Sequence, residues 1–255
     1  LRTITYSNSE LLPTQVTRRI SFVVSDGAAN SAPFHKFVGI TPVNYPPYFV
    51  DGSGNPITSI PLNTNEDTPL STCVNVIDPN GDPVSISSIT LTSGSGSFTL
   101  TGGLCFNFVP GPNFFGPVTA TISICDASSA CASATLNVSV AAVNDPPVIS
   151  GSPAVVTYPG SATVVDNTIT VTDVDNANLN GGTVTIDNNF VSTEDVLTFV
   201  NQGGITGNYN AATGVLTLSG SATLAAYSAA MRSITYTNLF QTSLLTRRIT
   251  FVAND

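Results

Sequence analysis

Apolar and polar residues alternate in short runs along this chain, and that alternation is the feature that most constrains its fold. Residues 131–140, for example, read Cys-Ala-Ser-Ala-Thr-Leu-Asn-Val-Ser-Val. Because successive side chains of a β-strand point to opposite faces of the sheet, such a run predicts a strand with one buried and one exposed face. The sequence therefore predicts an all-β fold, and its 42% of hydrophobic residues are enough to build packed cores.

Seven such runs within residues 46–145 indicate one immunoglobulin-like β-sandwich. Turn-forming residues separate the runs, and the predicted strands cover residues 57–62, 69–77, 84–91, 96–101, 104–109, 118–125 and 131–140. Seven strands in about 100 residues is the number found in an immunoglobulin-like domain. In that topology the second and fifth strands are neighbours in one sheet, and the sixth and seventh are neighbours in the other.

All four cysteines fall inside this predicted sandwich and test the strand assignment. Cys73 and Cys105, on the second and fifth strands, alternate with the apolar residues and so should face outward. Cys125 and Cys131, on the sixth and seventh strands, have the same parity. The closely spaced cysteine pairs of a zinc site are absent. We therefore expect two disulfides, Cys73–Cys105 and Cys125–Cys131, formed in an oxidising compartment.

The two ends of the chain are copies of one another. Residues 1–8, Leu-Arg-Thr-Ile-Thr-Tyr-Ser-Asn, match residues 231–238, and residues 17–26 match residues 246–255. The offsets are 230 and 229 residues, so one residue has been gained or lost in the loop between two strands. The chain is therefore predicted to be an interior part of a longer array of repeats, in agreement with its lack of a signal peptide and of a membrane-spanning apolar run.

Two Pro-Pro segments predict the domain boundaries. They lie at residues 44–47 and 144–147, and paired prolines stiffen a linker and end a β-ladder. We expect domains at residues 1–45, 46–145 and 146–255. In the last domain, residues 221–232 predict one short helix capped by Ser221. That domain should also lack its final strand, because the equivalent of its last strand is the segment Phe34-His-Lys-Phe-Val-Gly-Ile-Thr of the first domain.

Charge and composition exclude several function classes. The net charge of -9 would repel nucleic acids and anionic membranes. Catalysis needs converging bases, nucleophiles or metal ligands, and this chain has one His and no Trp. We therefore expect a protein that is not an enzyme.

Several motifs resemble known surface repeats. Residues 65–70 (Asn-Glu-Asp-Thr-Pro-Leu), 77–86, 105–117 and 124–131 resemble the Asn-Glu-Asp-Thr-Pro type of bacterial immunoglobulin-like repeat, in the disulfide-bearing version of Bacteroidota surface proteins. Residues 168–255 resemble the cadherin-like repeats of giant secreted adhesins. Similar repeats occur in gliding-motility adhesins of the SprB type, which are exported by type IX secretion. The resemblance thus implies tandem immunoglobulin-like and cadherin-like sandwiches on the outer surface of a bacterium.

Clusters of acidic residues are the candidate ligand sites. Hard oxygen ligands in flexible loops suit calcium, which takes roughly six to eight of them. One candidate set, similar to a cadherin linker, gathers at the second junction: Glu66, Asn144, Asp145, Asp173, Asp175 and Asp255. A weaker set lies near the first junction: Asp78, Asn80, Asp82 and Asp126. The alternative, that these residues only form turns through side-chain to backbone hydrogen bonds, stays equally open.

The leading functional expectation is a stalk of rigid sandwiches that projects an adhesive tip from the cell. Its partners would be neighbouring repeats of the same polypeptide, with surface glycans or a substratum bound by other regions. Two alternatives belong to other classes. One is a module that binds a glycan or a protein through loops, and the other is a subunit of an extracellular fibre assembled by strand donation.

Overall fold

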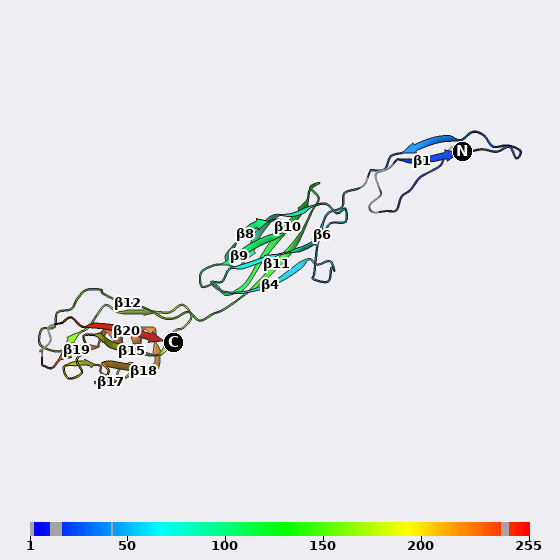
Figure 1. The fold of residues 1–255 in the computed structure, drawn as a ribbon. Helices are drawn as coiled ribbons and strands as arrows, with labels where there is room; N and C mark the ends of the chain where they lie inside the picture. Colours follow the sequence, from blue (N-terminus) through cyan, green and yellow to red (C-terminus); the bar gives the residue numbers. More distant parts are fainter. Residues whose placement is uncertain (1–2, 11–16, 42, 241–244) are drawn as a thin grey trace. The chain divides into compact units, whose positions relative to one another are not determined.

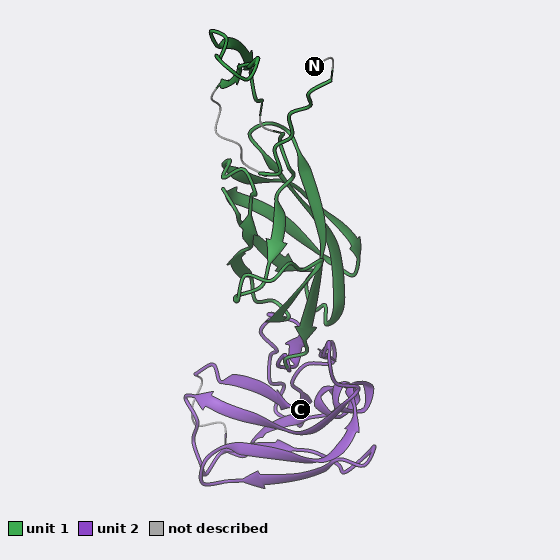
Figure 2. Ribbon diagram, turned by 90° about the vertical axis from the view of Figure 1, so that its right-hand side faces the viewer, with its two compact units in different colours: residues 1–143 green, residues 144–255 purple. Residues whose placement is uncertain are grey.

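The computed structural model describes residues 3–10, 17–41, 43–240 and 245–255 and confirms an all-β fold with one short helix (Figure 1). The chain divides into two compact units, residues 1–143 (unit 1) and residues 144–255 (unit 2), which Figure 2 colours separately. The finer division into three domains stays a prediction.

Unit 1 begins with an antiparallel hairpin of β1 (Arg18–Phe22) and β2 (Phe34–Val38). Ile20 lies opposite Lys36, and the Ser21 hydroxyl lies 2.8 Å from Nδ1 of His35 across the two strands. The carboxylate of Asp26 accepts the backbone N–H groups of Ala28 and Ala29 in the turn that follows β1. Residues 1, 2 and 11–16 of the repeated segment lie outside the described part of the chain.

The rest of unit 1 is an immunoglobulin-like sandwich. One sheet has the strand order β4-β11-β10-β7, and the facing strands form the sets β5-β9-β8 and β3-β6. The strands are β3 (Tyr48–Val50), β4 (Ser59–Asn65), β5 (Leu70–Cys73), β6 (Asn75–Ile77), β7 (Val84–Ser93), β8 (Gly96–Gly102), β9 (Cys105–Pro110), β10 (Gly116–Asp126) and β11 (Cys131–Ala141).

Alternation sorts the side chains of this sandwich as predicted. Phe106 of β9, Ile122 of β10 and Leu136 of β11 are completely buried in one core. The prediction missed β3, whose Phe49 is buried in the same core. The predicted strand 69–77 is also divided in two, because the chain leaves the pairing with β9 after Cys73 and pairs instead with β3.

Unit 2 has the same topological core with an insertion. Its sheets have the orders β17-β18-β15-β20, β13-β19-β16 and β12-β14. The elements are β12 (Val148–Ser150), β13 (Thr163–Val164), β14 (Thr170–Thr172), β15 (Asn178–Asn188), β16 (Asp195–Thr198), β17 (Thr206–Asn210), β18 (Val215–Thr223), α1 (Leu224–Arg232), β19 (Thr235–Asn238) and β20 (Arg248–Asn254). Relative to unit 1, the elements β17, β18 and α1 are inserted between two strands of the smaller sheet.

The predicted helix exists but begins later than expected. Residues 221–223 complete β18, so the helix starts at Leu224 and not at Ser221. Thr223 is the N-cap, since its hydroxyl accepts the N–H of Ala226 at 3.2 Å. The ladder between β15 and β18 extends to Thr223 and keeps these residues extended. Tyr227 and Met231, one helical turn apart, are completely buried against the sheet.

Candidate functional site

The two predicted disulfides are present. Cys73 and Cys105 lie directly opposite each other on β5 and β9 and are bonded, and so are Cys125 and Cys131 on β10 and β11. The bridges join positions 32 and 6 residues apart. Each bridge therefore joins two neighbouring strands of one sheet, as the parity of the cysteines and the immunoglobulin-like strand order together predicted.

Two of the four residues in the weaker acidic set, Asn80 and Asp126, hold the linker that precedes the sandwich. Oδ1 of Asn80 accepts the N–H of Tyr45 at 2.7 Å, and its amide donates to the carbonyl of Val43 at 3.0 Å. Oδ2 of Asp126 accepts the side-chain amide of Asn44 at 2.8 Å. Burial alone would raise the pKa of Asp126, but hydrogen bonds from Asn44, Ala130 and Ser128 together lower it.

The remaining two residues of this set shape their own loop. Oδ1 of Asp78 accepts the backbone N–H groups of Asn80 and Asp82, and its Oδ2 is buried without a hydrogen bond. Most oxygens of the weaker set are thus already used in turns and in holding the linker. This arrangement matches the turn interpretation of these residues.

Five residues of the stronger acidic set converge within unit 2. The amide of Asn144 donates to Oδ2 of Asp255 at 2.5 Å, and the N–H of Asp145 donates to Oδ2 of Asp175 at 2.6 Å. Oδ1 of Asp173 accepts the N–H of Asp175 at 2.9 Å.

Asn176, which the sequence analysis did not single out, ties this cluster together. Its amide donates to Oδ1 of Asn144 at 2.6 Å and to Oδ2 of Asp255 at 3.0 Å. Its position directly after the Asp-Val-Asp stretch is a signal that could have identified it. The cluster therefore joins the linker residues, the loop before β15 and the end of β20.

The fit of these residues to calcium is partial. Oδ2 of Asp173 in unit 2 and Oε2 of Glu66 in unit 1 are buried carboxylate oxygens without a hydrogen-bond partner, as is common for metal ligands. The other oxygen of Glu66 accepts the N–H of Val143 at 2.6 Å. Among the described residues, however, no three acidic, histidine or cysteine side chains come together as a metal site. A calcium ion at these residues stays a prediction.

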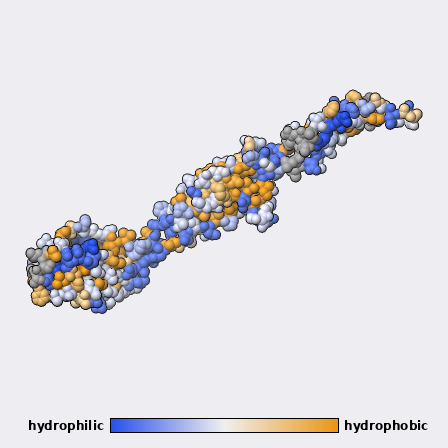
Figure 3. Space-filling view, in the orientation of Figure 1, coloured by the Kyte–Doolittle hydropathy of each residue, from blue (hydrophilic) through white to orange (hydrophobic). Residues whose placement is uncertain are grey.

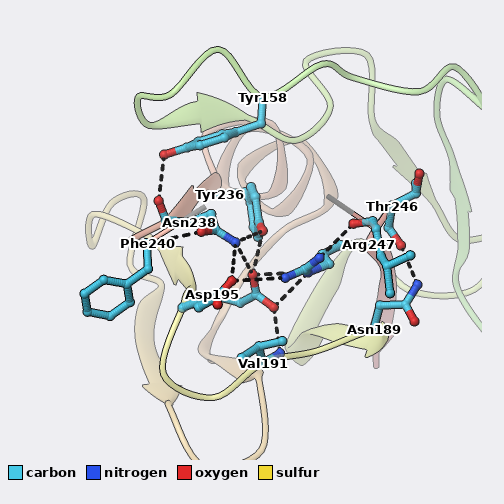
Figure 4. Close-up of polar contacts among 11 residues, drawn as sticks. Tyr158, Asn189, Val191, Asp195, Tyr236, Asn238, Phe240, Thr246 and Arg247 are labelled. Atoms are coloured by element: carbon cyan, nitrogen blue, oxygen red, sulfur yellow. Dashed lines mark hydrogen bonds and ion pairs between the residues drawn. The ribbon is translucent and has the colours of Figure 1, made fainter. Parts of the chain in front are cut away.

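The sequence analysis missed a buried charged network in unit 2 (Figure 4). Asp195 at the start of β16 is completely buried, and Nε of Arg247 lies 3.0 Å from its Oδ2. The Tyr236 hydroxyl donates to Oδ1 of the same carboxylate at 2.6 Å, and the amide of Asn238 donates to it at 3.1 Å. Glu194 accepts a second hydrogen bond from Asn238 and lies 3.6 Å from the guanidinium of Arg247.

Burial and hydrogen bonding shift the pKa values of two members of this network, Tyr236 and Arg247. Burial and the hydrogen bond to Asp195 raise the pKa of Tyr236 to about 12. Burial alone would lower the pKa of Arg247, but its hydrogen bond and ion pair with Asp195 raise it. Tyr236 thus stays a neutral phenol and Arg247 a guanidinium at physiological pH. The network joins β16, β19 and the segment before β20, and this role is structural.

The chain repeat was the signal that could have revealed this network. Tyr236, Asn238 and Arg247 correspond to Tyr6, Asn8 and Arg18 of the first copy. These three polar residues are identical in the two copies, as are most other residues of the matched segments. The sequence analysis used the match only to define the repeat.

One part of the chain matches a known protein-family model. Residues 53–139 match the family model described as a bacterial Ig domain. Halomucin of Haloquadratum walsbyi is 44% identical over 79 residues, which cover 29% of this chain and 1% of halomucin. The chain thus spans about 1% of the length of this curated relative.

The solved structures similar to this chain include cadherins. Human CDH23 EC21-23 matches with a TM-score of 0.41 and 16% identity, over 92% of this chain and 72% of that one. Protocadherin gamma B7 extracellular cadherin domains 1-4 match with a TM-score of 0.37 and 15% identity, over 93% of this chain and 57% of that one. No helix in the described residues is long and apolar enough to cross a membrane. Residues 53–139 are thus similar to a bacterial Ig domain, and the chain has cadherin-like structural neighbours.

Proposed function

We propose that this chain is a force-bearing structural segment of a long bacterial surface protein. The observation that carries this proposal is the parallel pairing of β4 with β11, from Ser59 opposite Thr135 to Asn65 opposite Ala141. Two hydrogen bonds extend the ladder, one from the N–H of Thr135 to the carbonyl of Thr58 and one from the N–H of Glu66 to the carbonyl of Ala141, both at 2.9 Å.

Parallel pairing of these two strands determines how the sandwich responds to tension. β4 lies near the start of the sandwich and β11 ends it, so tension on the two ends pulls the strands past each other along their length. The inter-strand hydrogen bonds are then loaded together, in shear, whereas a pair of strands pulled apart from one end opens one bond at a time. We name the β4–β11 pairing the shear clamp.

The disulfides support a location outside the cell. Disulfides persist in oxidising compartments and are rare in the cytosol. They also limit extension, because the chain between Cys73 and Cys105 cannot lengthen while the bridge is intact.

We propose that the chain is non-catalytic and that its partners are neighbouring repeats of the same polypeptide. The resemblance to exported gliding-motility adhesins adds the proposal that an adhesive tip, contacting glycans or a substratum, lies elsewhere on that polypeptide.

Single-molecule pulling of the full chain from its two ends tests the shear clamp. We expect the sandwich of unit 1 to unfold at higher force than unit 2, whose β20 has no equivalent neighbour among the described strands. Reduction should identify the event, because the bridges withhold 32 and 6 residues and their release adds roughly 130 Å at about 3.3–3.6 Å per residue.

A matched pair of variants at Thr135 isolates the clamp. Thr135→Pro removes the hydrogen bond to Thr58, whereas Thr135→Ala keeps the N–H and changes only an exposed side chain. The unfolding force should fall in the first variant and stay unchanged in the second. Equal forces in both variants, or a sandwich weaker than unit 2, would contradict a force-bearing role and favour a binding module.

A further inference from the structure

Within the described residues, the large sheet of unit 2 has no counterparts of β11 and β4, the two strands that lie beyond β10 in the large sheet of unit 1. In unit 1 the order β7-β10-β11-β4 places two further strands beyond β10. In unit 2 the equivalents of β7 and β10 are β15 and β20, and β20 is the edge of the sheet within the described residues. The counterpart of β4 in chain order, residues 151–158, follows β12 without forming a strand.

A groove lies at this edge of unit 2. It has a volume of about 1010 Å³, at the upper end of the roughly 300–1,000 Å³ of small-molecule pockets. Its lining includes Ile249 and Phe251 of β20 and residues 151–158. Val155 and Val156 of that segment are 79% and 51% exposed although valine favours strands. Figure 3 shows apolar residues interrupting the hydrophilic surface of unit 2.

The first copy of the repeat shows which strand neighbours β20. Residues 17–26 match residues 246–255, so β1 is the counterpart of β20. β2 pairs with β1 in antiparallel register, with Phe34 opposite Phe22 and Val38 opposite Arg18. Transferred to unit 2, this register sets Phe34 opposite Phe251 and Val38 opposite Arg247.

Side-chain parity makes this segment fit the groove. Residues directly opposite each other in a sheet share a face, so Phe34, Lys36 and Val38 would face the groove beside the inward Ile249 and Phe251. Phe37 would face solvent. The charged residues of the groove lining are Asp166, Arg247 and Arg248, so the fit of the segment depends on its apolar side chains and on the backbone edge, and not on charge.

We propose that this groove is a strand-acceptor site, and that its occupant is a segment of the same polypeptide beyond Asp255 with the sequence pattern of residues 34–38. The strand pairs antiparallel with β20 through the free backbone groups of its edge and parallel with residues 153–158, as β11 pairs with β10 and β4 in unit 1. It thereby gives unit 2 its own shear clamp. The acceptor site does not depend on the protein bearing force.

Adding residues to the C-terminus of the full chain tests the proposal. Because Asp26 corresponds to Asp255, residues 27–41 appended after Asp255 continue the repeat in register. Hydrogen exchange of the β20 amides and of residues 153–158 should slow by about tenfold or more, and the Tm of unit 2 should rise by at least about 4 °C. An extension that changes neither exchange nor Tm overturns the acceptor site.

Two variants of the appended segment test its orientation. Phe34→Asp in the appended copy should abolish the protection, because that side chain faces the groove, and Phe37→Asp should preserve it. Equal loss in both variants would overturn the register. Sedimentation of the unextended chain tests the source of the strand: a concentration-dependent dimer abolished by Phe34→Asp in its own β2 would show that a second copy fills the groove and overturn the assignment to the continuing polypeptide.

Discussion

Nε of Arg247 lies 3.0 Å from Oδ2 of Asp195, and the two side chains are 4% and 0% exposed. A buried ion pair is costly to break, because removing one partner leaves a buried charge without compensation. Arg247→Met should therefore lower the free energy of unfolding of unit 2 by about 3–5 kcal/mol. Calorimetry of the full chain measures the loss, and faster amide exchange in β16 and β19 assigns it to unit 2.

A second ion pair provides the matched control for this prediction. Arg248 donates to Asp187 at 2.8 Å, but its side chain is 69% exposed. Solvent screens such a pair, so Arg248→Met should lower the free energy of unfolding far less than Arg247→Met. Equal losses in the two methionine variants would show that the network around Asp195 contributes nothing beyond a surface salt bridge.

Alkaline pH should destabilise unit 2 through Tyr236. Its pKa is raised to about 12, from an ordinary 10, by burial and by the hydrogen bond to Asp195. A group whose pKa is raised in the folded state contributes stability that is fully present below pH 10 and is lost as the pH rises toward 12. Tyr236→Phe should flatten this part of the stability profile, measured by denaturation between pH 9 and pH 12. The same slope in wild type and variant would exclude Tyr236 as its source.

The two disulfides should contribute unequally to the stability of the sandwich. In the chain-entropy model the loop closed by Cys73 and Cys105 is worth about 3.7 kcal/mol, and the loop closed by Cys125 and Cys131 about 2.4 kcal/mol. Replacing each pair by serines and measuring denaturation tests the order. A larger loss on removal of the shorter loop would show that the hairpin bridge acts in the native state and not through chain entropy.

Calcium should stabilise unit 2 if the loop carboxylates bind it. A ligand at one hundred times its Kd adds about 2.7 kcal/mol to the free energy of unfolding. Asp173→Asn keeps the hydrogen bonds to the loop but removes a charge, so it should abolish the rise of Tm with calcium. Asp187→Asn, outside the cluster, should leave the rise intact. The same Tm in calcium and in chelator would eliminate the ion and leave these residues as turn formers.

The pairing of the cysteines could be predicted because the period of a strand is a local property. Parity placed Cys73 and Cys105 on the outward face, and the immunoglobulin-like strand order placed their two strands side by side. By contrast, β3 spans only Tyr48–Val50, which is too short to display a period. The start of α1 was wrong because Ser221 is a good capping residue, whereas the sheet pairing that keeps it extended is a tertiary effect.

In the candidate sites, too, short-range contacts could be predicted and contacts between distant strands could not. Short-range side-chain to backbone bonds, such as those of Asp173, follow from sequence spacing. The pairing of Asp195 with Arg247 spans 52 residues, and charged residues read from sequence are expected at the surface. Their burial depends on β16 and β19 lying side by side, which no local pattern encodes.

Arg247 and Asp195 are 52 residues apart in the sequence, and this separation limits where the polypeptide can be divided into fragments. A truncation that falls between the two residues leaves one of them to be buried alone, and the fragment then folds only by exposing it to water. Fragments intended for expression should therefore begin ahead of the acidic pair and not at the nearest apolar strand.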